Sequence, residues 1–173
     1  TIDSTTYAQP AALKDAVAAG AVDIAVLPEP MVTIAINAAK SANNGTVITN
    51  AMDLTAEWNK VSAPGSLVQG CVVVRRAFLE QYPEAVENFL KEYKASIEAV
   101  KADVDTAAAL CEKHGIIAKA AIAKQAIPKC NITFATGADM KAKLTGYFTV
   151  LHAANPASIG GKMPAVPKNT DAL

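Results

Sequence analysis

The cysteines and histidines of this chain are the side chains that could bind a metal or form a disulfide. The sequence contains three cysteines, Cys71, Cys111 and Cys130, and two histidines, His114 and His152. No Cys-x-x-Cys pair occurs, and neither histidine lies at metal-ligand spacing from the other or from a cysteine, so we expect no metal site. A disulfide between Cys111 and Cys130 is one interpretation, and three small buried apolar residues is the other.

Motifs for nucleophilic catalysis and nucleotide binding are missing from the sequence. The chain has no Gly-x-Ser-x-Gly, no phosphate-binding loop and no Gly-x-Gly-x-x-Gly. Glu29 could serve as a general base, but no acid or nucleophile stands near it in the sequence. Both histidines fall where helix C-termini are expected, a place that suits an imidazole. We therefore expect a protein that performs no covalent chemistry and needs no cofactor.

Composition and charge limit the remaining functions. Lys plus Arg and Asp plus Glu number 16 each among 173 residues, so the basic excess of a nucleic-acid binder is absent. Apolar residues make up 51% and aromatic residues 5%, an alanine-rich mixture that favours packed helices. No run of about 20 apolar residues could span a membrane. These features predict an ordered chain without a nucleic-acid partner.

The beginning of the chain alternates between helical and strand-like patterns. Helices and strands are expected in turn over residues 9–19, 22–27, 31–42 and 46–49. This alternation is typical of a parallel α/β sheet. A less regular stretch follows over residues 50–66, and we place a lobe boundary within residues 62–70.

The remainder of the chain is mainly helical in pattern. One strand is predicted over residues 67–74, and a short extended piece over residues 132–134. A long amphipathic helix begins at Pro83. Further helices are predicted over residues 105–113, 118–126 and 136–152. The apolar faces of these helices need a cover. Sequence upstream of Thr1 or another copy of the chain would provide it, so self-association is expected.

Three stretches of the sequence resemble one protein family. Residues 18–30 read AAGAVDIAVLPEP, which resembles the small-Gly, Val-Asp-hydrophobic, Glu-Pro signature of the nitrate/sulfonate/taurine solute-binding family of ABC importers. Residues 70–75, followed by Tyr82-Pro83-Glu84-Ala85-Val86, are similar to that family's return strand and next helix. Residues 147–164 are similar to its end. The three stretches follow in order along nearly the whole chain.

The resemblance implies an α/β fold of the type II periplasmic-binding-protein kind, here an incomplete two-lobe architecture with a helix-rich C-terminal part. Residues 1–65 would be the end of the second lobe, and residues 66–173 the C-terminal part of the first lobe after the hinge. The chain would be the extracytoplasmic solute-binding subunit of an ABC importer, in the periplasm or lipid-anchored at the cell surface. Its partners would be a small polar or anionic solute, such as a sulfonate, nitrate or a thiamine-precursor-like molecule, and the membrane permease.

Several residues are expected to bind the solute in the cleft between the lobes. They are Glu29, Pro30, Thr33, Ser66, Gln69 and Gly70. The first three surround the start of a predicted helix at the carboxyl end of a strand, where ligands of open α/β sheets gather. The others lie at the expected joint. Glu29 also has a structural alternative, an acid that favours the helix dipole. A structural role is equally open for Ser66, Gln69 and Gly70.

Two other functions share the implied architecture and stay open. An effector-binding domain of a transcriptional regulator would need a helix-turn-helix upstream of Thr1. An enzyme of the same fold, such as a thiamine-pyrimidine synthase-like protein, would need reactive histidine, cysteine or metal clusters. A signal peptide or lipobox in the upstream sequence would indicate the binding protein.

Overall fold

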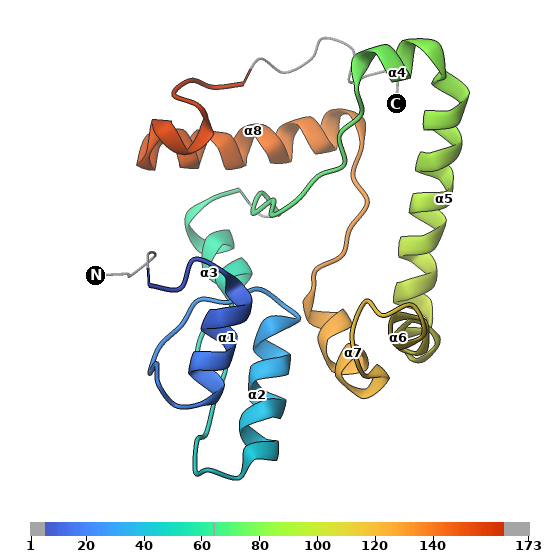
Figure 1. Ribbon diagram of the computed structural model, residues 1–173. Helices are drawn as coiled ribbons and strands as arrows, with labels where there is room; N and C mark the ends of the chain where they lie inside the picture. The colour runs from blue at the N-terminus through green and yellow to red at the C-terminus, as the bar shows by residue number, and fades with distance from the viewer. Residues whose placement is uncertain (1–5, 64, 165–173) are drawn as a thin grey trace. The chain divides into compact units, whose positions relative to one another are not determined.

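The computed structural model describes residues 6–63 and 65–164 (Figure 1), and this part of the chain is helical. Eight α-helices and two 3-10 helices follow one another in it, and it contains no β-strand. No helix in these residues is both long and apolar enough to cross a bilayer. The elements are α1 (Pro10–Ala18), α2 (Met31–Ala42), α3 (Leu54–Val61), α4 (Arg76–Gln81), α5 (Pro83–Ala102), α6 (Val104–Lys113), α7 (Ala120–Ala126), η1 (Ile127–Lys129), α8 (Gly137–Ala154) and η2 (Pro156–Ile159).

The predicted α/β fold of the type II periplasmic-binding-protein kind is therefore wrong for the described residues. The segments predicted as strands are non-helical, but none forms a ladder with another described residue. They are residues 22–27, 46–49, 67–74 and 132–134. A β-strand exists as part of a hydrogen-bonded pair. Their β-branched composition correctly indicated segments that avoid helix, but composition alone supplies no partner strand.

The described residues divide into two compact units. The first contains the residues up to Ala51 together with Ala95–Thr133, and the second contains Met52–Lys94 together with the residues from Phe134 on. The assignment of residues 1–65 and 66–173 to two lobes stays a prediction.

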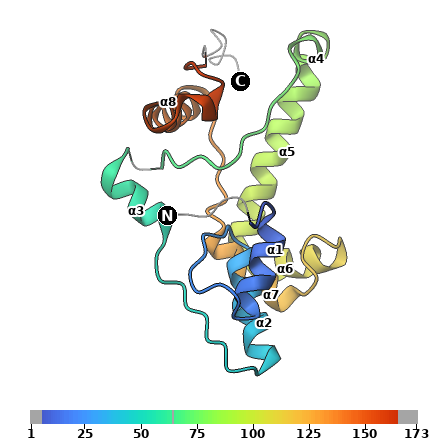
Figure 2. The same cartoon turned by 60° about the vertical axis from the view of Figure 1, so that its left-hand side comes forward.

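The core of the first unit is built from small side chains on α6 and α7. Ala107, Ala108 and Ala123 are buried there with Ile127 of η1. Figures 1 and 2 both show α6 and α7 side by side, and the two helices are in contact. Alanine favours the helix and loses no rotamer freedom on burial, so it suits a close helix pair.

Local signals determine where several helices begin and end. α2 ends at Asn43, whose backbone is left-handed with φ of 48°. The helix predicted from residue 105 begins at Val104 and is capped by Asp103. One oxygen of the Asp103 carboxylate accepts from the Thr106 backbone N–H at 3.0 Å, and the other accepts from the Thr106 hydroxyl at 2.6 Å. These caps satisfy backbone groups that the helix itself leaves unpaired.

Candidate functional site

The start of α2, in the first unit, brings two of the predicted site residues together. Oε2 of Glu29 accepts a hydrogen bond from the backbone N–H of Thr33 at 3.2 Å. Pro30 lies between them at the N-cap position of the helix. An α-helix leaves the N–H groups of its first turn unpaired, and its dipole favours a negative charge there. Glu29 therefore caps α2, which is the structural role that the sequence left open for it.

The side chain of Thr33 is buried without a partner for its hydroxyl. Thr33 is 2% exposed, and its Oγ1 has no hydrogen bond with any described residue. A buried polar group left unpaired costs about 1–3 kcal/mol. Oγ1 of Thr33 is closed to solvent, so a bound molecule could pair with the hydroxyl only if the start of α2 opened.

A line of hydrogen bonds continues from this position to α7. The carbonyl of Thr33 accepts from Nδ2 of Asn37 at 2.8 Å, and the same nitrogen donates to Oε1 of Gln125 at 3.2 Å. Neither residue was predicted from the sequence as part of a site. Asn37 stands four positions after Thr33, so the helical period could have identified it. Gln125 is 88 positions from Asn37, and no local signal connects them.

Cys130 directly follows η1, and its thiol is half-buried. Partial burial raises the pKa of the Cys130 thiol, and the Glu29 carboxylate and Cys111 raise it further. Cys111 and Cys130 are free, half-buried thiols, whereas Cys71 is exposed, contrary to the interpretation that all three are buried.

Ser66 has a structural role in the second unit. It is 1% exposed, its Oγ accepts from Nε1 of Trp58 at 2.8 Å, and its hydroxyl donates to the Ala63 carbonyl at 2.6 Å. The Trp58 ring lies against Tyr147 of α8, with centroids 5.7 Å apart. A Cβ at Gly146 would lie 3.2 Å from the Cβ of Ser66, so glycine permits this close approach. The hydroxyl thus anchors the loop after α3.

The remaining predicted residues of the second unit differ from Ser66. Gln69 and Gly70 are exposed, and no Cβ added at Gly70 would meet a neighbouring atom within 4 Å. Backbone crowding therefore does not require a glycine there. The prediction that these residues share one cleft with Glu29, Pro30 and Thr33 stays a prediction.

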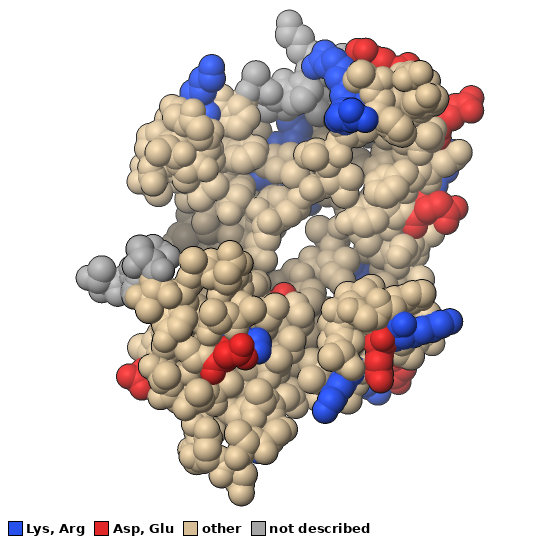
Figure 3. Space-filling view, viewed as in Figure 1, with Lys and Arg blue, Asp and Glu red and all other residues tan. Residues whose placement is uncertain are grey.

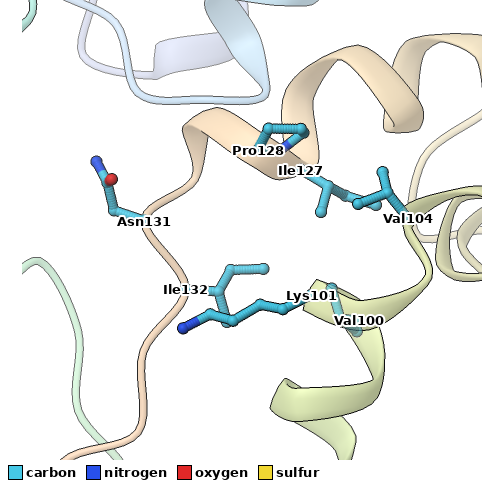
Figure 4. Close-up of a pocket in the computed structure, with 7 residues that line it drawn as sticks. All are labelled: Val100, Lys101, Val104, Ile127, Pro128, Asn131 and Ile132. Atoms are coloured by element: carbon cyan, nitrogen blue, oxygen red, sulfur yellow. The ribbon is translucent and has the colours of Figure 1, made fainter.

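The first unit also contains a cavity of about 390 Å³ that sequence reasoning missed (Figure 4). It lies between the end of α5, the start of α6, and η1 with the segment that follows it. Its lining residues are Val100, Lys101, Val104, Ile127, Pro128, Asn131 and Ile132. They are spread over the sequence from position 100 to position 132, so no single motif predicts the cavity.

Charged side chains of both signs are interspersed on the face shown in Figure 3. An example in the first unit is Nζ of Lys124 on α7, 2.6 Å from Oδ1 of Asp105 on α6. Such exposed pairs contribute about 0–1 kcal/mol. Within residues 6–63 and 65–164, no group of three or more His, Cys, Asp or Glu side chains could hold a metal ion.

No model of a known protein family matches this chain, and no curated protein or solved structure matches it either. The likeness to solute-binding proteins of ABC importers therefore rests on the three sequence stretches that carry it.

Proposed function

We propose that this chain is an extracytoplasmic solute-binding component of an ABC importer, which captures a small polar solute and delivers it to a membrane permease. The observation that carries the proposal is the buried Thr33 hydroxyl, which has no partner among the described residues and stands one turn from Glu29. The order of the three family-like sequence stretches supports the same function. The solute is bound and released without a covalent step.

The charge at the start of α2 narrows the class of solute. A carboxylate has about four lone-pair positions, and Glu29 uses one of them for the Thr33 N–H. The Thr33 hydroxyl adds one donor and two acceptor positions. Among the solutes suggested by the sequence, a donor-bearing, thiamine-precursor-like heteroaromatic suits this carboxylate better than a sulfonate or nitrate. The last two would be repelled by Glu29.

Calorimetric titration of the purified chain with an aminopyrimidine, taurine and nitrate tests the proposal. We expect the aminopyrimidine to bind and Glu29→Gln to weaken its binding by about tenfold, because a charge-assisted hydrogen bond is lost. Glu57→Gln is the matched control, since Glu57 is paired with Lys60 in the second unit. Absence of binding by all three solutes, or equal binding by Glu29→Gln and the native chain, would contradict the proposal.

A further inference from the structure

The cavity of Figure 4 has a wall of aliphatic side chains. Val100, Val104, Ile127 and Ile132 line it, and Figure 4 shows Val104 and Ile127 next to each other at one side with Ile132 across from them. Ile127 is 9% exposed and belongs to the buried core, against which Val100 and Val104 also pack. The wall is therefore continuous with the packed part of the first unit. Its volume of about 390 Å³ lies in the range of small-molecule sites.

A single charged side chain accompanies this wall among the described lining residues. Lys101 projects from the last turn of α5, and Figure 4 shows its aliphatic stem reaching toward the Ile132 segment with the nitrogen at the far end. Lys101 forms no ion pair within the described part of the chain. A lysine that lays its stem along apolar surface keeps its ammonium available at the rim.

We infer that this cavity is a binding site for a small organic anion whose branched aliphatic body fills the apolar space and whose carboxylate pairs with Lys101. The inference goes beyond the proposed function, because none of the lining residues belongs to the start of α2. The apolar wall selects for the body of the ligand, at about fourfold in affinity for each buried methylene. The ammonium selects for the charge, because an exposed lysine that pairs with a carboxylate adds about two- to fivefold in affinity over a neutral molecule of the same shape.

Titration calorimetry with isovalerate, isoamyl alcohol and acetate separates the two contributions. Isovalerate has both the branched body and the carboxylate, whereas the alcohol lacks the charge and acetate lacks the body. We expect isovalerate to bind about two- to fivefold more tightly than the alcohol and at least about tenfold more tightly than acetate. Equal binding of isovalerate and the alcohol would overturn the role of Lys101, and absence of isovalerate binding would overturn the site.

Variants then locate the binding. Lys101→Gln should weaken isovalerate binding by about two- to fivefold, and Lys101→Arg should retain it, because the charge is kept. Lys91→Gln, an exposed lysine of the same helix that does not line the cavity, is the matched control. Val104→Phe should abolish binding by filling the cavity. Native-like binding by Lys101→Gln would overturn the inference even if Val104→Phe fails to fold. Thr33→Val should leave isovalerate binding unchanged, which keeps this site distinguishable from the start of α2.

Discussion

The α6–α7 pair and the segment of residues 67–74 are both apolar, yet they differ in burial. Ala108 on α6 and Ala123 on α7 are 2% and 0% exposed, whereas Val73 is 85% exposed. Each of the two helices has the other to pack against. The valine-rich segment has no ladder partner among the described residues. An apolar segment of this protein is therefore buried where another helix packs against it. Hydrophobicity alone does not bury a segment.

The largest effect on stability is expected from a charged side chain introduced at the centre of the α6–α7 contact. Ala123→Asp should destabilise the first unit by about 3–5 kcal/mol, because it buries a carboxylate without a partner. Ala121→Asp on the exposed face of the same helix should change the free energy of unfolding by less than about 0.5 kcal/mol. Urea unfolding measures both. Similar losses for the two variants would show that α7 is not packed as described.

The second prediction concerns self-association of the chain through the exposed segment of residues 67–74. An apolar segment without charged residues is prone to pair with other chains, so we expect the purified chain to be a dimer or larger. Val73→Lys should shift it toward the monomer, while Ala77→Lys, which adds the same charge at an exposed position of α4, should not. Sedimentation equilibrium measures the mass. A native chain that is monomeric at micromolar concentration would contradict this expectation.

A smaller effect on stability is expected at Thr33. Its hydroxyl is buried, as the alanines of α6 and α7 are, but it lacks a hydrogen-bond partner among the described residues. Thr33→Val should stabilise the protein by about 1 kcal/mol, because it removes an unpaired buried hydroxyl and keeps the shape of the side chain. Thr149→Val on α8 is the control, since that hydroxyl donates to the Thr145 carbonyl at 2.8 Å. A loss of stability in Thr33→Val, measured by urea unfolding, would show that the hydroxyl is paired.

The smallest effect concerns the cap that begins α6. Hydrogen bonds from the Thr106 hydroxyl and then the Thr106 backbone lower the pKa of Asp103. A lowered carboxyl pKa contributes stability that is present above the unfolded value, about 3.9, and is lost as the pH falls through the folded value. Asp103→Ala should therefore lower the melting temperature near neutral pH, and the difference from the native chain should shrink below about pH 4. A difference that is constant with pH would contradict this.

The sequence predicted helices well where a complete local signal was present. The helix expected over residues 31–42 is confirmed as α2, because Pro30 precedes it and Asn43 can take the left-handed backbone that ends it. The helix α3 was missed within the stretch read as irregular. Its signal was Asp53, whose side chain accepts from the Thr55 N–H at 2.8 Å. Strand pairing was predicted wrongly, since it depends on a partner that residues 22–27 do not encode.

In the candidate site, contacts between residues close in the sequence could be predicted, and contacts between distant residues could not. The contact between Glu29 and Thr33 spans one helical turn, so local periodicity placed both residues together. The hydrogen-bond partners of Ser66, which are Nε1 of Trp58 and the carbonyl of Ala63, also lie nearby in the sequence, in α3 and the loop after it. In contrast, Gln125 and the cavity of Figure 4 join elements far apart in the sequence. Residues brought together by packing of distant helices leave no signal in a local pattern.

The most direct test of the proposed function is titration of the aminopyrimidine into Thr33→Val and Thr33→Ser. Valine keeps the shape of the side chain without the hydroxyl, and serine keeps the hydroxyl without the methyl group. If the buried hydroxyl binds the solute, Thr33→Ser should retain affinity and Thr33→Val should lose about tenfold, the loss expected for one buried hydrogen bond. Native affinity in Thr33→Val would contradict the account, because the unpaired hydroxyl would then have no part in binding.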